Sequence, residues 1–542
     1  MAAMAAGLAL LRQAIMNRIL SHRPELAVTR RATLHAADGD RSEGEDRISA
    51  LSDDLLGLVV SRLPIDDAVR TTALSTRWRR IWHGAPLVLC DEHIPASTQD
   101  ERIATIDHVL AAHSGPFQSV DLACCFAKKE RELAQWQRLL AARGVQDLTF
   151  VSLPGELGLR LAPDILRCAK LRHLCLGFWT FPDTANLPDG AGFFPHLEEL
   201  DILYTKMEDR DLDHMLASSP VLKTLTLVWS GPQPNHISLL SPSLQCTLIV
   251  NSRVMDLALV DVPCLERLIL HGNSTSTLNG SLPLRILRAP ELKVLGYLNT
   301  RVNQIQIGDI IIEAGTKVSP NTKVPSVKIL AVMVNLHIFK EVQMLCSFLR
   351  CFPNIEILHL ESVVADESSD MPNAEFFQQP SPIECVQHIK EVFLYKFQGH
   401  QCEMAFLKYL CQRANQMRKL TLVLCGTILD SVDMIKAQLG DLVIPSLASE
   451  ACMVLLLEPV VEVMSFNYAS DLSIHDPFVS DHGNELFISM KREKKVWTEQ
   501  TPVQHCFTTQ AVQGGNDTEP ITEEEALGRG KRMKKPVRRM DL

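Results

Sequence analysis

The sequence lacks the motifs through which most enzymes hold a phosphate, a metal or an activated nucleophile. Its 542 residues contain no Gly-rich phosphate loop, no GxSxG elbow and no HExxH pair. The 15 cysteines form no CxxC pair, and a structural zinc site needs clustered ligands. The closest approach is His400 with Cys402, which we interpret as a turn and a core contact. We therefore expect no catalytic residue, no metal site and no cofactor.

An excess of positive charge is also missing. The formal net charge is −10 and the pI is about 6.0, whereas a dedicated nucleic-acid-binding domain is usually basic. No apolar run reaches the roughly 18–20 residues that a membrane-spanning helix needs. Cysteines at positions suited to a buried apolar residue, such as Cys175 and Cys246, indicate a reducing compartment. We expect neither a membrane nor a nucleic acid as partner.

Most of the chain should fold, because hydrophobic residues make up 46% of it and charged residues 22%. Residues 1–45 carry early arginines, as an organelle transit segment does, but we interpret them as a disordered extension that ends in a polar linker. Residues 431–497 give a weak pattern, in which the apolar stretch from Ala451 to Met464 could add a strand. Residues 498–542 have the composition of a disordered tail.

Three short helices are predicted between Ile48 and Trp82. Ser52 or Asp53 can cap the first helix, Asp66 the second and Ser75 the third. Pro64 stops the first helix. The apolar residues of these helices recur at helical spacing. In the first helix they are Leu55, Leu58, Val59 and Leu63, and in the third they are Trp78, Ile81 and Trp82.

The string DRISALSDDLLGLVVSRLPIDDAVRTTALSTRWRRIW, Asp46 to Trp82, resembles a plant F-box in the order and spacing of its motifs. Ser52 stands where that family usually has Pro, and Ser is itself a good cap. We assign residues 46–85 to this module. The resemblance implies that it docks on a Skp-type adaptor, which bridges to a cullin scaffold. The adaptor-binding residues implied are Leu51, Leu55, Leu63, Pro64, Leu74, Trp78 and Trp82, while Val59 and Ile81 are assigned to the core of the module.

A motif of the form L-x-x-L-x-L recurs after Trp82, often at intervals of 25 to 28 residues, which is typical of leucine-rich repeats. Each copy predicts a short strand whose leucines point into a solenoid, and neighbouring repeats must stack to bury them. The central leucines of the clear copies are Leu174, Leu200, Leu225, Leu268, Leu295, Leu330 and Leu358, and weaker copies lie at Val145–Phe150 and Ser243–Ile249. We predict an irregular α/β solenoid, a horseshoe, over residues 86–383.

Residues 384–430 form a strand–turn–helix–strand pattern with the segments HIKEV and FLKYL. This stretch resembles the FBD module of plant F-box/leucine-rich-repeat proteins. The helix has an apolar face of Leu407, Leu410, Cys411 and Ala414, and the polar turn lies around Gly399. We interpret the unit as a further repeat that could close the solenoid.

Together the two resemblances imply a non-catalytic substrate-receptor subunit of a Skp–cullin–F-box ubiquitin ligase complex, which captures an unknown protein substrate. The substrate-binding residues expected on the concave strand face are Glu198, Glu199, Asp201, Lys223, Thr224, Glu266, Arg267 and Lys293. The alternative is a leucine-rich-repeat interaction scaffold that is not coupled to ubiquitination.

The tail GRGKRMKKPVRRMDL carries seven Lys or Arg residues. It can be a solvated terminus, a nuclear import signal or an arm that binds phosphates weakly, which would make the chain a nuclear regulator that touches nucleic acid. The import signal would consist of Lys531, Arg532, Lys534, Lys535, Arg538 and Arg539. The expected location is the nucleus, the cytoplasm or both.

Overall fold

The structure is a computed structural model that describes residues 48–500 with gaps. The gaps are residues 95, 97, 125, 127–128, 153–158, 185–192, 229–233, 251–253, 273–281, 317–318, 364–383, 427–431, 458–468, 480–486 and 492–497. The extension 1–45 and the basic tail lie outside the described residues, and so do the six residues of the import signal.

The described part of the chain begins with the three predicted helices, which are α2 (Asp53–Ser61), α3 (Ile65–Thr71) and α4 (Thr76–Gly84). Ser52 caps α2, because its side chain accepts a hydrogen bond from the backbone N–H of Leu55, and Ser75 caps α4 in the same way. The predicted cap of α3 is wrong. That helix starts directly after Pro64, so Asp66 lies in its first turn.

The core of the helical module contains Leu56 and Val60 of α2, both fully buried, together with Ile81 and Trp82 of α4. Ile81 and Val59 were both predicted to lie in this core. Ile81 does, whereas Val59 is 45% exposed. The sequence of α2 has apolar residues at 55–56 and at 58–60, so helical spacing fits two different faces. The structure buries the face that carries Leu56 and Val60.

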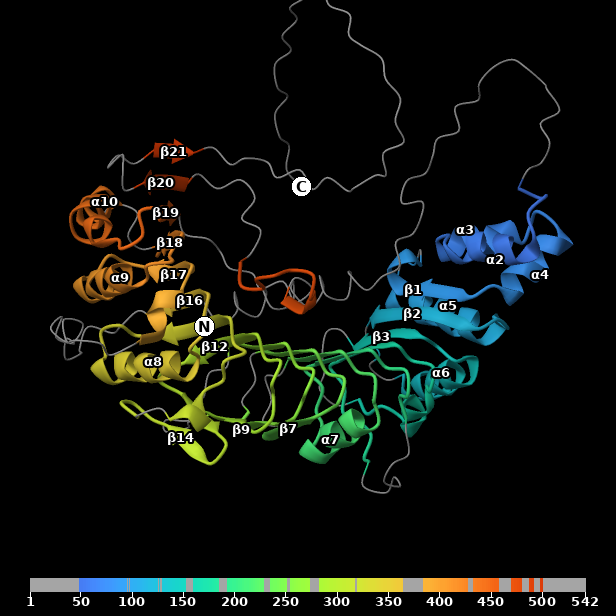
Figure 1. The fold of residues 1–542 in the computed structure, drawn as a ribbon. Coiled ribbons are helices and arrows are strands. Elements are labelled where there is room, and N and C mark those ends of the chain that lie inside the picture. The colour runs from blue at the N-terminus through green and yellow to red at the C-terminus, as the bar shows by residue number, and fades with distance from the viewer. Residues whose placement is uncertain are drawn as a thin grey trace, which may run out of the picture. The chain divides into compact units, whose positions relative to one another are not determined.

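A long sheet of 16 strands runs through the rest of the described chain (Figure 1). Every pairing in it is parallel from β1 to β19, and antiparallel from β19 to β21. Its first seven strands are β1 (Leu87–Cys90), β2 (Phe117–Cys124), β3 (Asp147–Ser152), β4 (His173–Gly177), β5 (Glu199–Leu203), β6 (Thr224–Val228) and β8 (Cys246–Val250). They are followed by β10 (Arg267–His271), β12 (Val294–Asn299), β15 (Ile329–Val334), β16 (Ile357–Ser362), β17 (Glu391–Phe397), β18 (Lys419–Leu424), β19 (Met453–Leu457), β20 (Phe487–Lys491) and β21 (Thr498–Gln500).

The predicted leucines form a continuous row on one side of this sheet. Leu174 is in register with Leu200, and Leu200 with Leu225. The central leucines of all seven clear repeats are at most 2% exposed. Stacking of neighbouring strands therefore buries the leucine side chains that a single repeat would leave exposed. The prediction of a leucine-rich-repeat region after the helical module is confirmed.

The leucine side of the long sheet is covered by two kinds of element. Helices cover its two ends, whereas a second sheet of five strands lies between α7 and α8 in chain order (Figure 1). The helices are α5 (Gln99–Ala112), α6 (Glu130–Arg143), α7 (Asp209–Ala217), α8 (Phe339–Cys351), α9 (Gln401–Arg413) and α10 (Val432–Gln438). The second sheet contains β7 (His236–Leu240), β9 (Asp256–Asp261), β11 (Leu282–Ile286), β13 (Asn303–Ile307) and β14 (Ile310–Ile312).

The predicted strand–turn–helix–strand unit is present as β17, α9 and β18, and the four residues of its predicted apolar helix face are buried. Gly399, in the turn, has a φ of +76°, which favours glycine. The unit does not close the solenoid, because β19, from the stretch where a strand was expected, pairs beyond β18. The last strand, β21, begins at Thr498, where the sequence predicts disorder.

Candidate functional site

Exposed large apolar side chains are concentrated in the helical module. Among the described residues, seven of the 17 exposed large hydrophobics lie within residues 48–74. We call these seven the exposed helix set. They are Ile48, Leu51, Leu55, Leu58, Val59, Val69 and Leu74, and their exposed fractions range from 36% to 67%. An apolar set of this density in one small module is typical of a protein-binding surface.

The residues predicted to bind an adaptor separate into three groups. Leu51, Leu55 and Leu74 are exposed, and Leu63, Pro64 and Trp78 are half-buried. Trp82 is only 9% exposed and packs in the core, with its ring edge against His113 at a centroid distance of 5.0 Å. Sequence analysis did not assign Val69, and it assigned Val59 to the core.

Arg77 holds the loop that presents Leu51. Its guanidinium donates hydrogen bonds to the backbone carbonyl oxygens of Ser49 (2.5 Å) and Leu51 (2.6 Å). It also pairs with Asp53 at 2.7 Å. Three contacts from one planar guanidinium fix the start of α2 against the start of α4.

The second candidate surface is the side of the long sheet opposite the leucine row, which we call the open face. Glu199, Asp201, Thr224 and Arg267 lie on it, at alternate positions to the buried leucines. Glu198, Lys223, Glu266 and Lys293 instead come directly before β5, β6, β10 and β12. The eight predicted substrate-binding residues therefore occupy two positions of the repeat.

Those that precede the strands form ion pairs between neighbouring repeats. Glu198 binds Arg172 at 2.7 Å and Lys223 at 2.6 Å, and Glu266 binds Lys293 at 2.9 Å. Hydrogen bonds from Lys223 and Arg172 lower the pKa of Glu198 to about 2. These side chains connect repeats to one another along the starts of the strands.

Glu356, like Glu198, binds two basic side chains of neighbouring repeats. From this arrangement we predict a loss of stability at low pH. It binds Lys390 at 2.5 Å and Lys328 at 2.9 Å, and these hydrogen bonds lower its pKa from 4.5 to about 2. A carboxyl whose folded pKa is depressed adds stability above its unfolded pKa, and that stability is lost as the pH falls. The loss should run from about pH 4.5 to about pH 2.

We expect Glu356→Gln to remove this part of the pH dependence and to lower the melting temperature at pH 7 more than at pH 2. Thermal unfolding between pH 7 and pH 2 measures it, and Glu450→Gln, at an exposed position, is the control. Equal pH profiles for wild type and Glu356→Gln would contradict the assignment.

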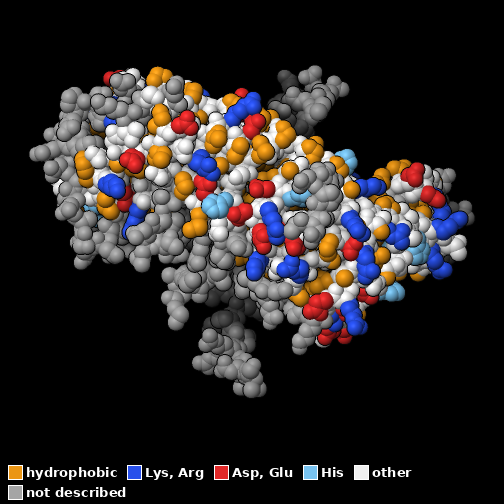
Figure 2. Space-filling model, turned by 90° about the horizontal axis from the view of Figure 1, so that it is seen from below, with side chains coloured by type: hydrophobic (Ala, Val, Ile, Leu, Met, Phe, Trp, Pro, Cys, Tyr) orange, Lys and Arg blue, Asp and Glu red, His pale blue; other side chains and the backbone are white. Residues whose placement is uncertain are grey.

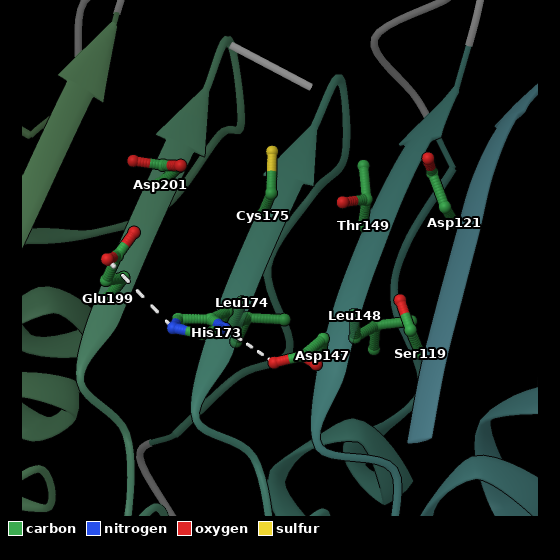
Figure 3. Close-up of a pocket in the computed structure, with 10 residues that line it drawn as sticks. All are labelled: Ser119, Asp121, Asp147, Leu148, Thr149, His173, Leu174, Cys175, Glu199 and Asp201. Carbon is green, nitrogen blue, oxygen red and sulfur yellow. Dashed lines mark hydrogen bonds and ion pairs between the residues drawn. The ribbon is translucent and has the colours of Figure 1, made fainter. Parts of the chain in front are cut away.

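A pocket lies on the open face across β2 to β5 (Figure 3). Its polar side chains are mostly acidic, and Figure 3 shows them projecting from adjacent strands. His173 lies between Asp147 and Glu199, and its hydrogen bond to Asp147 raises its pKa. The lining residues are Ser119, Asp121, Asp147, Leu148, Thr149, His173, Leu174, Cys175, Glu199 and Asp201. Two predicted substrate-binding residues, Glu199 and Asp201, thus come together here.

Three of the four predicted open-face residues are buried, and among them Asp201 is 2% exposed. Thr224 is 7% exposed and Arg267 is 4% exposed. Arg267 lies under residues 469–479, a segment that follows it by about 200 positions. Sequence analysis missed this contact, because the segment has neither repeat spacing nor periodicity. The one signal was an arginine at a strand position where the preceding repeats hold Thr224 and Cys246.

His400 and Cys402 meet a third residue, His337. His400 lies 3.3 Å from Nε2 of His337, while the thiol of Cys402 lies 3.6 Å from Nδ1 of the same ring. Because the two contacts use opposite nitrogens, the three groups do not converge on one point. Within the described parts of the chain, no group of three or more His, Cys, Asp or Glu side chains is placed to hold a metal ion.

Two further observations concern the surface. Acidic and basic side chains are interspersed over the described part of the face that Figure 2 shows, rather than gathered by sign. Of the helices that the structure describes, none is both long enough and apolar enough to cross a membrane.

Three family models match the chain. The F-box domain matches residues 48–88, the LRR repeats of the FBD-associated F-box protein At5g56370 match residues 133–360, and FBD matches residues 378–422. The first match contains the exposed helix set, and the second contains the open face from β3 to β15 and the first part of β16.

Relatives from Arabidopsis thaliana carry two or all three of these names. F-box/LRR-repeat protein 13 is 25% identical over 465 residues, which is 77% of this chain and 98% of the relative. F-box/FBD/LRR-repeat proteins At5g56420 and At1g13570 are 28% and 26% identical over 41% and 34% of this chain. The chain spans only 54% and 44% of the lengths of those two. With all three models in order along it, the chain has the domain combination of plant F-box/LRR proteins that contain an FBD module, and it is similar to them.

Proposed function

We propose that this chain is the substrate-receptor subunit of a Skp–cullin–F-box ubiquitin ligase complex. The observation that carries the proposal is the exposed helix set, which lies inside the F-box match. These apolar side chains have exposed fractions of 36% to 67%, so a partner that covers them lowers the free energy of the complex. The partner on this surface is a Skp-type adaptor, and through it a cullin scaffold.

The leucine-rich solenoid, as an irregular horseshoe, captures a protein substrate on its open face. The receptor itself makes and breaks no bond. Its contribution is to hold the substrate near an activated ubiquitin thioester, which raises the local concentration of acceptor lysines and orients them. The complex acts in the nucleus, the cytoplasm or both, with the six basic residues of the tail as the import signal.

Co-purification with a Skp-type adaptor from the same source tests docking. We expect the intact chain to bind and the double variant Leu55→Asp, Leu58→Asp to lose about 100-fold in affinity, because two charges then enter a desolvated apolar interface. Both residues are about half exposed, at 49% and 51%, so the fold should tolerate the change.

A matched control replaces two leucines of similar exposure, one in β7 and one directly after β11, as Leu240→Asp with Leu287→Asp (57% and 55% exposed). Circular dichroism first verifies that every variant is folded. If the well-folded intact chain fails to bind the adaptor, the ligase proposal falls and the uncoupled scaffold takes its place.

A further inference from the structure

The open face already holds a peptide, and that peptide is part of the same chain. Residues 469–479, with the sequence ASDLSIHDPFV, lie over it as turns and a short helical turn rather than as a strand. Hydrogen bonds or ring contacts connect this segment to residues of five different strands: β8, β10, β12, β16 and β17. Figure 1 shows the segment on the side of the sheet away from the helices.

Arg267 binds the main chain of this segment. One guanidinium nitrogen donates to the carbonyl oxygens of Ala469 (3.3 Å) and Asp471 (2.8 Å). The other donates to those of Leu472 (3.4 Å) and Ile474. Burial lowers the pKa of Arg267. A buried cation surrounded by four carbonyl oxygens recognises the path of a turn, whatever side chains the turn carries.

Two side chains of the segment are recognised individually. The carboxylate of Asp476 accepts a hydrogen bond from Nε2 of His359 at 2.9 Å, and the ring of His359 is fully buried. The ring of Phe478 lies edge-on to Tyr297, with centroids 5.1 Å apart, and 5.3 Å from the ring of His359. The hydroxyl of Tyr395 donates to the carbonyl oxygen of Phe478 at 3.4 Å. The open face thus contacts both an acidic residue and the aromatic residue two positions after it.

These contacts are separate from the core that stabilises the solenoid. Ala469 packs in one small apolar cluster of the open face, with Val228 and Ile269, and Phe478 packs in another, with Phe393. Neither cluster includes the leucine row, which belongs to the main core. Asp471, Ser473 and His475 remain exposed. The segment can therefore leave the open face without opening the solenoid.

We infer that residues 469–479 imitate the partner of this surface, which is a protein segment that carries an aspartate two residues before an aromatic residue and forms a turn over Arg267. The chain's own copy competes with that partner. The inference rests on the proposed receptor function and names the class of its substrate. Because the internal copy is tethered, it acts at a high effective concentration, and only a partner of the same chemistry displaces it.

Fluorescence polarisation with the labelled peptide ASDLSIHDPFV tests this on the full chain. The variant Asp476→Ala, Phe478→Ala weakens the internal copy, so we expect it to bind the peptide at least about tenfold more tightly than the intact chain does, since more of its open face is free. The control peptide replaces the same two residues, Asp by Asn and Phe by Ala, and should bind the variant at least about tenfold more weakly. Arg288→Ala, in an exposed ion pair elsewhere, should leave peptide binding unchanged.

If the variant binds the peptide no more tightly than the intact chain, or binds both peptides equally, the inference is wrong. Hydrogen exchange on the intact chain covers the case of a variant that does not fold. The amide of Ile474, bonded to the carbonyl oxygen of Asp471, should exchange by local opening, far faster than the amides of β10 and β16. Exchange at the same rate as those strands would make the segment an integral part of the fold and overturn the inference.

The peptide titration contains no adaptor, so it can fail independently of the docking experiment. A negative titration with intact adaptor binding removes the partner class and leaves the receptor function. A positive titration without adaptor binding assigns the same peptide site to an uncoupled scaffold.

Discussion

Trp179→Ala is expected to destabilise the solenoid by about 3–5 kcal/mol, as is usual when a buried tryptophan is truncated. The side chain of Trp179 is fully buried after β4, and its ring stacks on Phe150 with centroids 4.6 Å apart and on Phe126 at 5.6 Å. Its indole N–H also donates to the carbonyl oxygen of Phe150 at 2.7 Å. The variant loses the packing and leaves that carbonyl without its donor.

Chemical denaturation followed by circular dichroism measures the change. Phe339→Ala is the control, because Phe339 is 42% exposed, and it should cost far less. A loss below about 1 kcal/mol for Trp179→Ala would mean that the aromatic cluster relaxes around the cavity and is not a fixed part of the core.

Trp82→Ala should lower the free energy of unfolding by about 3–5 kcal/mol as well, with the loss in the helical module. Trp82 contacts the ring of His113, whose Nε2 lies 2.9 Å from the carbonyl oxygen of Ala85, so these residues connect α4 to the first repeat. Burial lowers the pKa of His113. We expect faster hydrogen exchange throughout α2, α3 and α4.

The same variant tests the assignment of Trp82 made from sequence. If Trp82→Ala keeps the stability of the wild type and loses only adaptor affinity, Trp82 contacts the adaptor and does not stabilise the helical module. Trp78→Ala is the natural comparison, since Trp78 is half-buried on the same helix and should cost less stability.

The solenoid was predictable because its repeats leave a periodic record. Leu200 and Leu225 are buried for the same reason at the same position of successive repeats, so spacing alone identifies the strands and the direction of their side chains. The residues between the leucines have no such record. Spacing places Glu199 and Asp201 on the open face, but it does not say that Glu198 pairs with Arg172 and Lys223 instead of facing a partner.

Three features were out of reach for physical reasons. The adjacent apolar residues of α2 satisfy two helical faces equally, and only packing against α4 decides that Leu56 is inside and Leu55 outside. The strands of the second sheet, such as β9, stand where a helix could equally cover the repeat. The contact of Arg267 with residues 469–479 joins segments about 200 positions apart, and local sequence carries no information about it.

The order of synthesis gives that long separation a kinetic meaning. Arg267 precedes Ala469 by 202 positions. Because ribosomes add about 5–20 residues per second, the segment that covers the strands around Arg267 is made about 10–40 s after Arg267 itself. Leu248, Val250 and Ile269 are buried in the finished protein and belong to the surface that stays uncovered until residues 469–479 are made. Newly made chains therefore pass through an interval in which this apolar surface is uncovered and prone to aggregation, whatever their final stability.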